Sequence, residues 1–402
     1  MSVGPRARRL LPPIAAMVIV VAALWPLTHP IMGVGDTFQF WFAGHLVATG
    51  ISPYDRSAWT AAESTYGPRA ANVAMACADP DSGACSWVYP PATGWLLAPF
   101  GAAGVDAGLP AVDGFVLATA FVGVITAVLL FGPVAAGARA LVLVTVVASH
   151  PFVYDVHVGH FIGLELLGVV GVAYGLRERR DWPLVLGGLV LSLTPHLFII
   201  LVPLVAVALV ARRRWRAITL CAAALAALVV AGALLEPAAF PTILQRAGPK
   251  AGLTWSTPWA LAQLVAPTAP LVLYVALVGL AALAAIAVWR TAPPEDRDLA
   301  LIAAGTGLSL TATPYAQPYD LLLLVPAIAF IARAASRSRA PHRAALLATL
   351  PILYVGGTWF PLIATRLWED SNSALALVPV VVLALAAVAS ATARPRAIGS
   401  VA

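Results

Sequence analysis

Residues 177–216 read RERRDWPLVLGGLVLSLTPHLFIILVPLVAVALVARRRWR, a long apolar run with a cluster of arginines at each end. Arginine and lysine concentrate in the cytoplasmic loops of membrane proteins, so both flanks are expected on one side. A single full span would separate the two clusters and invert every later segment. We therefore predict a helical hairpin that enters and leaves from the cytoplasm. Its break is expected at Thr194-Pro195-His196, because proline removes a helical hydrogen-bond donor.

The composition of the whole chain is typical of a polytopic membrane protein. Of its 402 residues, 61% are hydrophobic and 10% charged, and the mean hydropathy is +0.89. Apolar runs of about 20 residues, the length of a spanning helix, recur from Leu10 to the C-terminus. Residues 1–402 are therefore expected to form one integral membrane domain. The net charge of +6 lies in short clusters between apolar runs, a pattern that argues against nucleic acid as a partner.

About ten full spans are predicted, with both termini in the cytoplasm. The N-terminal run resembles a secretory signal, but no small-residue cleavage site follows it before Gly33, so it is interpreted as an uncleaved first span. This topology leaves few of the 24 Lys and Arg residues outside: Arg56, Arg69, Arg246, Lys250 and Arg366. The expected spans are 12–31, 109–136, 139–152, 161–176, 217–235, 266–289, 299–313, 318–333, 343–361 and 374–392.

The first extracytoplasmic loop, 32–108, begins GVGDTFQFWFAGHLVATGISPYD at residue 33. Residues 37–49 are predicted to form a short helix in the membrane interface, with Phe38, Trp41 and Phe42 at headgroup level. Asp36 has two interpretations. It is either the N-cap of this helix or a general base, because a carboxylate at a hydrocarbon boundary indicates a functional site. Asp55 is likewise either a helix cap or a site residue.

The second half of this loop carries Cys77 and Cys85, followed by Trp87-Val88-Tyr89-Pro90-Pro91. In an oxidising compartment the two cysteines are candidates for a disulfide, and two free thiols are the alternative. The apolar segment after the two prolines is too short to span the membrane, so a re-entrant or interfacial helix is expected there.

These motifs resemble glycosyltransferase family 87 of the GT-C fold class. The family includes polyprenyl-phosphate-mannose-dependent α-mannosyltransferases and an arabinofuranosyltransferase of actinobacterial envelopes. The matching positions are Asp36, Gly50, Pro53, Tyr54, Asp55, Tyr89, Pro90 and Pro91, with weaker echoes in Gly159-His160, Pro195, Trp255–Trp259 and Thr313-Pro314-Tyr315. The chain has His160 where the family usually has Gln and His196 where it often has Lys, and no His follows Thr313-Pro314.

The resemblance implies an all-α, GT-C-like enzyme of the plasma membrane that inverts configuration. It would move a sugar, mannose, from a polyprenyl-phosphate donor to a glycolipid or cell-envelope glycan outside the cell. Asp36 is the expected base for the acceptor hydroxyl. No cofactor or metal is expected, because cations and N–H donors can stabilise the departing phosphate. The expected substrate-binding residues are Tyr54, Asp55, Tyr89, His160, His196, Arg246, Lys250, Tyr315 and Gln317.

Simpler explanations stand beside these assignments. Lys250 is equally explained as a solvated charge or a contact with lipid headgroups, His196 as a buried core histidine, and Tyr89 and Tyr315 as part of an aromatic belt. A metal site is a further alternative at four residues that crowd one outer turn, although their spacing is not characteristic of a metal site; they are His150, Asp155, His157 and His160.

Three alternative functions remain open from the sequence. Arabinofuranose in place of mannose is the nearest, because both donors share the phosphate and the polyprenyl tail. A polytopic transporter of lipids or solutes is disfavoured, because the sequence has no two related halves and its acids gather at the outer ends of spans. A non-catalytic assembly factor is the third alternative.

Overall fold

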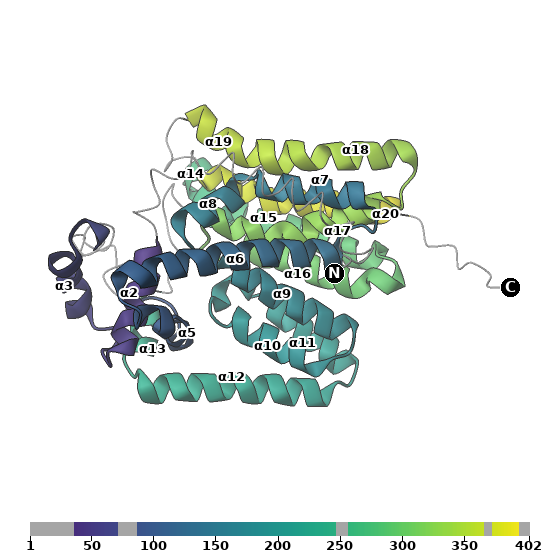
Figure 1. The fold of residues 1–402 in the computed structure, drawn as a ribbon. Helices are drawn as coiled ribbons and strands as arrows, with labels where there is room; N and C mark the ends of the chain where they lie inside the picture. Colours follow the sequence, from purple (N-terminus) through teal and green to yellow (C-terminus); the bar gives the residue numbers. More distant parts are fainter. Residues whose placement is uncertain (1–35, 71–86, 247–255, 366–371, 394–402) are drawn as a thin grey trace, which may run out of the picture.

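The computed structural model describes residues 36–70, 87–246, 256–365 and 372–393, and this part of the chain is helical without any strand. Figure 1 shows the long helices side by side in one bundle, with α2, α3, α5 and α13 gathered at one end. The α-helices are α2 (Asp36–Ala48), α3 (Arg56–Tyr66), α5 (Pro91–Gly101), α6 (Val105–Phe131), α7 (Ala136–Val147), α8 (His150–Val158), α9 (Ile162–Arg177), α10 (Asp181–Leu191), α11 (Leu201–Ala211), α12 (Trp215–Leu235), α13 (Ala239–Arg246), α14 (Pro258–Val265), α15 (Pro270–Thr291), α16 (Arg297–Ala312), α17 (Val325–Ala335), α18 (Ala340–Pro351), α19 (Gly357–Thr365) and α20 (Leu377–Thr392). Short 3-10 and π segments connect them: η2 (Gly67–Ala70), η3 (Pro195–Phe198), η4 (Pro294–Asp296), η5 (Pro318–Leu324), η6 (Ile352–Gly356) and η7 (Asn372–Ala376).

Within the described residues, six helical segments are long and apolar enough to cross a membrane. They are Val105–Phe131, Trp215–Leu235, Pro270–Thr291, Pro318–Ala335, Ala340–Pro361 and Asn372–Thr392, and the pair α7 and α8, bent by 53°, makes a seventh if it counts as one span. A multi-pass helical membrane protein is thus confirmed. The count of about ten stays a prediction. The expected spans 161–176 and 299–313 appear as α9 and α16, which have 16 residues each, and 12–31 lies outside the described residues.

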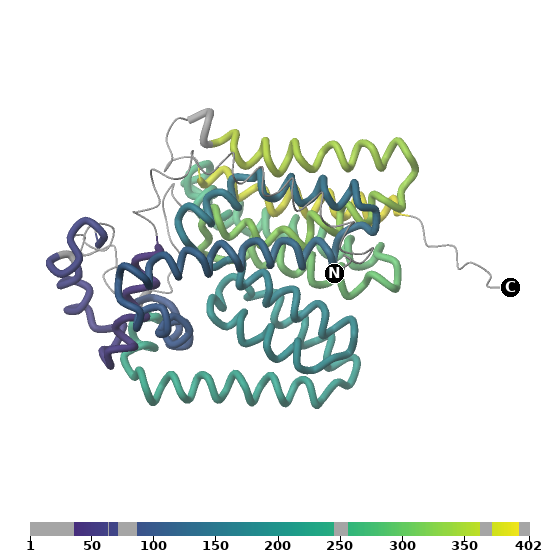
Figure 2. Tube along the Cα trace, viewed as in Figure 1, coloured from purple at the N-terminus to yellow at the C-terminus, as the bar shows by residue number. Residues whose placement is uncertain are grey.

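The arginine-flanked stretch turns back on itself. Helices α10 and α11 are separated by η3, which begins at Pro195, so the chain breaks where the sequence predicts. The two ends of the stretch meet, because Arg214 contacts Asp181 at 2.6 Å and donates to the carbonyl of Gly175 at 2.9 Å. The tube in Figure 2 follows this return of the chain. The side of the membrane from which the hairpin enters stays a prediction.

The bundle is organised around the segment formed by η5 and α17. Its residues are almost all buried, and α16, α20 and α6 pack against it. Helices α12 and α15 lie at the outside and expose apolar side chains such as Val229 and Leu271. Exposed apolar residues on the outer helices are the surface that lipid covers. The buried helices therefore form the protein core, and the exposed ones form the lipid-facing layer.

A second, smaller core forms at one end, where α2 crosses α5. The crossing is tight: a Cβ on Gly101 would lie 2.0 Å from the backbone nitrogen of His45. Phe38, Trp41 and Phe42 of α2 are at most 5% exposed. Helices α3, α5 and α6 cover these rings, so the aromatic side chains pack inside the protein and do not face lipid headgroups. This corrects the predicted exposure of the three rings, whereas the interfacial position of the helix stays a prediction.

Candidate active site

Asp36 is the first residue of α2 and is half-buried. Its neighbour Thr37 donates to Asp113 of α6 at 2.9 Å. Thr37 also packs on Gly159, where a Cβ would lie 1.9 Å from the Thr37 hydroxyl oxygen. Gly159 has φ +76°, which any other residue adopts only with strain. The glycine before His160 therefore brings the turn between α8 and α9 against the start of α2.

The two motifs of the first loop pack against each other. The backbone nitrogen of Trp87 donates to the carbonyl of Pro53 at 3.2 Å, and the indole of Trp59 donates to the same carbonyl at 2.7 Å. The hydroxyl of Tyr54 donates to the carbonyl of Tyr89. Tyr54 is buried, so in this structure it positions Tyr89. The following Pro91 is the first residue of α5, where a missing N–H costs nothing.

Tyr89 links this loop to the bundle. Its hydroxyl is 2.8 Å from Nε2 of His160, and the His160 ring stacks on Tyr319 with centroids 4.3 Å apart and planes inclined by 16°. His196, at the break of the hairpin, packs edge-on against Tyr315 at 5.2 Å. The structure therefore brings Tyr89, His160, His196 and Tyr315 to the same end as Asp36, from four separate parts of the sequence.

Asp55 and Gln317 have structural contacts of their own. Asp55 is exposed and accepts hydrogen bonds from the backbone and hydroxyl of Ser57, at 2.9 and 2.7 Å, so it caps the start of α3. Gln317 and Asp320 form a reciprocal capping box at the start of η5, in which the Gln317 backbone donates to Asp320 at 2.6 Å. The cap that the sequence offered as the alternative for Asp55 is therefore present.

The site is buried, and among the described residues no lysine or arginine forms an ion pair with its acids. Burial raises the pKa of Asp36 from its ordinary value to about 7. Burial lowers the pKa of His160 to about 3, with a smaller contribution from His196, so the imidazole of His160 is neutral at pH 7. Asp36 also lies within electrostatic range of three tyrosines and an acid: Tyr89, Tyr315, Tyr319 and Asp320.

One buried acid near the site was missed by the sequence reasoning. Glu165 lies near the start of α9, beside Thr194, and is fully buried. Asp155 of α8, which the sequence offered only as a metal ligand, is also fully buried and lies within electrostatic range of Asp36 and Asp320. A single acid within an apolar run is the only local signal of such a residue, and it is a weak one.

No three His, Cys, Asp or Glu side chains of the described residues come together as a metal site. The ring of His150 packs on Tyr154 and Trp359, whereas His160 faces Tyr89. Several predicted residues lie outside the described structure, namely Lys250, Arg366, Cys77, Cys85 and the side chain of Arg246. Of the other outer arginines, Arg56 is exposed and Arg69 pairs with Asp106 at 2.7 Å.

A model of glycosyltransferase family 87 matches residues 87–314, more than half of the chain. The chain belongs to glycosyltransferase family 87. It is therefore a membrane glycosyltransferase, which decides against a transporter or an assembly factor. No curated protein and no solved structure matches the chain. The family 87 match includes Tyr89, His160 and His196 and begins after Asp36, Tyr54 and Asp55. The structure places Asp36 and Tyr54 beside the matched residues, whereas Asp55 caps α3.

Proposed function

We propose that this family 87 enzyme moves mannose from a polyprenyl-phosphate donor to a hydroxyl of a glycolipid or cell-envelope glycan, with inversion. The reaction would take place at the outer face of the plasma membrane, with both termini in the cytoplasm. Asp36 carries the proposal. It is a carboxylate with a pKa of about 7 at the start of α2, beside a cluster of tyrosines. A general base works best when its pKa is close to the working pH.

The proposed step is a direct displacement at the anomeric carbon. The acceptor oxygen bonds to this carbon while its proton passes to the carboxylate of Asp36. The bond between the anomeric carbon and the phosphate oxygen breaks, and polyprenyl phosphate leaves with the electron pair. Attack opposite to the leaving group inverts the configuration, so a β-linked donor gives an α-linked product.

The departing phosphate needs hydrogen-bond donors or cations. Because His160 is neutral, it and Tyr89 can offer hydrogen bonds but no charge. We assign the charge to Arg246 and Lys250. Figure 1 supports this choice, because α13, which ends at Arg246, lies at the same end of the bundle as α2.

Arabinofuranose is the alternative sugar, because its lipid-linked donor presents the same phosphate and tail. Membranes that contain the protein would be incubated with labelled polyprenyl-phosphate mannose and, separately, with the labelled arabinofuranose donor. Transfer of mannose to lipid-extractable or envelope material is expected. Transfer of arabinofuranose alone would replace the sugar, and transfer of neither would overturn the proposed donor class.

The Asp36→Asn variant tests the base. Loss of a general base lowers rates by about 10²–10⁴-fold, so transfer is expected to fall by that factor. The Asp55→Asn variant is the matched control, because Asn caps a helix as well as Asp does and residue 55 lies in the same loop. It is expected to keep nearly full activity. Full transfer by Asp36→Asn, or an equal loss in both variants, would remove Asp36 from the mechanism.

A further inference from the structure

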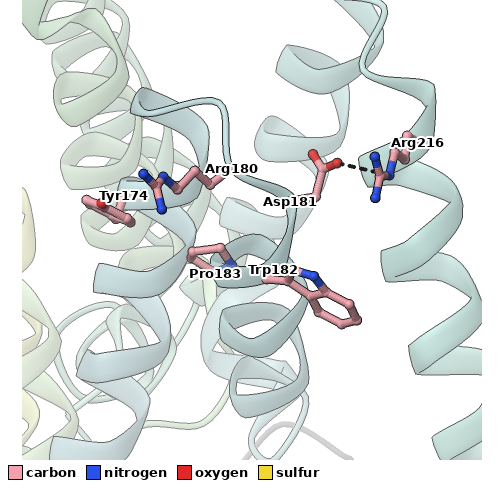
Figure 3. Close-up of a pocket in the computed structure, with 6 residues that line it drawn as sticks. All are labelled: Tyr174, Arg180, Asp181, Trp182, Pro183 and Arg216. Atoms are coloured by element: carbon pink, nitrogen blue, oxygen red, sulfur yellow. Dashed lines mark ion pairs between the residues drawn. The ribbon is translucent and has the colours of Figure 1, made fainter.

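A shallow pocket of about 470 Å³ opens where α9, α10 and α12 meet, at the end of the bundle opposite to Asp36. Figure 3 shows the residues that line it. Tyr174 comes from α9, Arg180 precedes α10, and Arg216 comes from the first turn of α12. The remaining lining residues are Asp181, Trp182 and Pro183 of α10.

The pocket lies in an excess of positive charge. The two connections that form it, together with the adjoining helix ends, carry seven arginines at positions 177, 179, 180, 212, 213, 214 and 216. Three acids face them, and two of these are each held by a close arginine: Asp298 by Arg212, and Asp181 by Arg214 at 2.6 Å. The third, Glu178, contacts Arg177 at 3.5 Å. Seven arginines against three acids leave a local charge of +4.

Two of these arginines line the pocket and are not neutralised by a close acid. Arg180 is exposed, and it forms no ion pair with the other lining residues in Figure 3. Arg216 approaches Asp181 only at 3.5 Å, and its side chain is 82% exposed. Because Arg214 already pairs with Asp181, this carboxylate orients Arg216 and does not cancel its charge. Arginine forks match the oxygens of a phosphate well.

The pocket also borders the lipid-facing surface. Trp182 is 67% exposed and Leu186, one turn further along α10, is 60% exposed. Most of the α12 surface is exposed as well, and its residues are apolar. Tryptophan at the end of an apolar face is typical of the headgroup level of a bilayer. A phosphate in the pocket would therefore lie directly above the layer of acyl chains.

We propose that this pocket binds the phosphate group of an anionic membrane phospholipid. Arg216 pairs with the phosphate oxygens at one side of the pocket, and Arg180 adds positive charge at the other side, beside Tyr174. Trp182 lies beside the headgroup, and the acyl chains follow the apolar faces of α10 and α12. Basic pockets between membrane helices are known to select anionic headgroups. This lipid is distinct from the proposed donor, whose site lies at the other end of the bundle.

The test uses the purified full-length protein in detergent micelles. Native mass spectrometry would follow binding of phosphatidylglycerol, with phosphatidylcholine as the neutral comparison and inorganic phosphate as a competitor. The pocket variant is Arg180→Gln with Arg216→Gln. The matched control is Arg339→Gln with Arg343→Gln, which removes the same charge from exposed positions just before and within α18, at the same end of the bundle.

The pocket variant is expected to bind phosphatidylglycerol about tenfold or more weakly, whereas the control variant and Asp36→Asn bind it like the wild type. Unchanged binding in the pocket variant, or an equal loss in the control, would overturn the proposal. Displacement by inorganic phosphate at the same concentration would also do so, because the site would then recognise a free anion. If the double variant fails to fold, Arg180→Gln alone is tested by the same criteria, because it breaks no ion pair among the lining residues. Its affinity for phosphatidylglycerol is expected to fall about threefold.

Discussion

The two ends of the bundle differ in whether their buried acids have arginine partners. At the arginine-rich end, Asp296 is 2% exposed and contacts Arg333 at 2.9 Å and Arg337 at 2.5 Å. At the other end, Asp155, Glu165 and Asp320 are at most 2% exposed, and no lysine or arginine of the described residues pairs with them. A buried acid with a cation holds helices together, whereas one without a cation costs free energy and points to function.

Breaking the paired acid should produce the largest change in stability. The Asp296→Asn variant leaves Arg333 and Arg337 buried without their anion, and removing one partner of a buried ion pair costs about 3–5 kcal/mol. Unfolding in mixed micelles with increasing SDS would measure it. Transfer per folded molecule is expected to be unchanged, because Asp296 lies at the end opposite to Asp36.

The Asp298→Asn variant is the control for that prediction. Its partner, Arg212, is more exposed than Arg333, and exposed ion pairs contribute about 1 kcal/mol or less. Equal losses of stability in Asp296→Asn and Asp298→Asn would show that burial does not make one ion pair more stabilising than the other. A loss of transfer in Asp296→Asn molecules that remain folded would break the contrast between the two ends.

The second prediction concerns the pH dependence of transfer. The base must be ionised, and burial raises the pKa of Asp36 to about 7. Transfer is therefore expected to fall as the pH drops through 7, by about tenfold per unit, to about a hundredfold below its plateau at pH 5. Initial rates in buffered membranes would measure it. The residual transfer of Asp36→Asn should be flat over this range, and a surviving acid limb in that variant would assign the titration to another group.

The sequence predicted the features that depend on local signals. The two arginine clusters and Pro195 predicted the hairpin and the position of its break, because each of these signals can be recognised within a few neighbouring residues. The buried position of Phe38, Trp41 and Phe42 was not predictable, since helical spacing defines an apolar face but not what covers it. The contact between Tyr89 and His160 joins residues 71 positions apart, and no local pattern reports such a contact. Glu165 was missed because one acid in an apolar run is a weak signal.

The third prediction tests how the site end is held together. The Gly159→Ala variant forces a Cβ into the hydroxyl of Thr37 at a backbone conformation with φ +76°. We expect a loss of about 2–3 kcal/mol in stability, together with reduced transfer, because Thr37 adjoins Asp36.

The Gly50→Ala variant isolates the steric contact. Gly50 has the same φ of +76°, but a Cβ there has nothing within 4 Å. Its stability should fall by only about 1 kcal/mol, which is the cost of placing alanine in a left-handed conformation. If both variants lost the same stability and kept full transfer, the contact between Gly159 and Thr37 would have no part in placing Asp36.

The smallest expected effect is that of Tyr89→Phe. It removes the hydroxyl that lies 2.8 Å from Nε2 of His160, and a neutral hydrogen bond contributes about 1 kcal/mol. Transfer should therefore fall about fivefold. Tyr274→Phe is the control, because the Tyr274 hydroxyl also donates a single bond, to Ala312 at 2.8 Å. Among the described residues, Tyr274 makes no hydrogen bond or ring contact with the cluster around Asp36. This control variant should keep full transfer.

The pH profile of Tyr89→Phe distinguishes a positioning role from a change in charge. His160 is neutral, so losing its hydrogen bond with Tyr89 removes no charge from the site. The rate should drop at every pH while the midpoint stays near 7, which is set by the burial of Asp36. A midpoint that moved by a full unit would mean that Tyr89 controls the ionisation of the base. The site end would then control its acid through hydrogen bonds, whereas the opposite end holds Asp296 in place with two arginines.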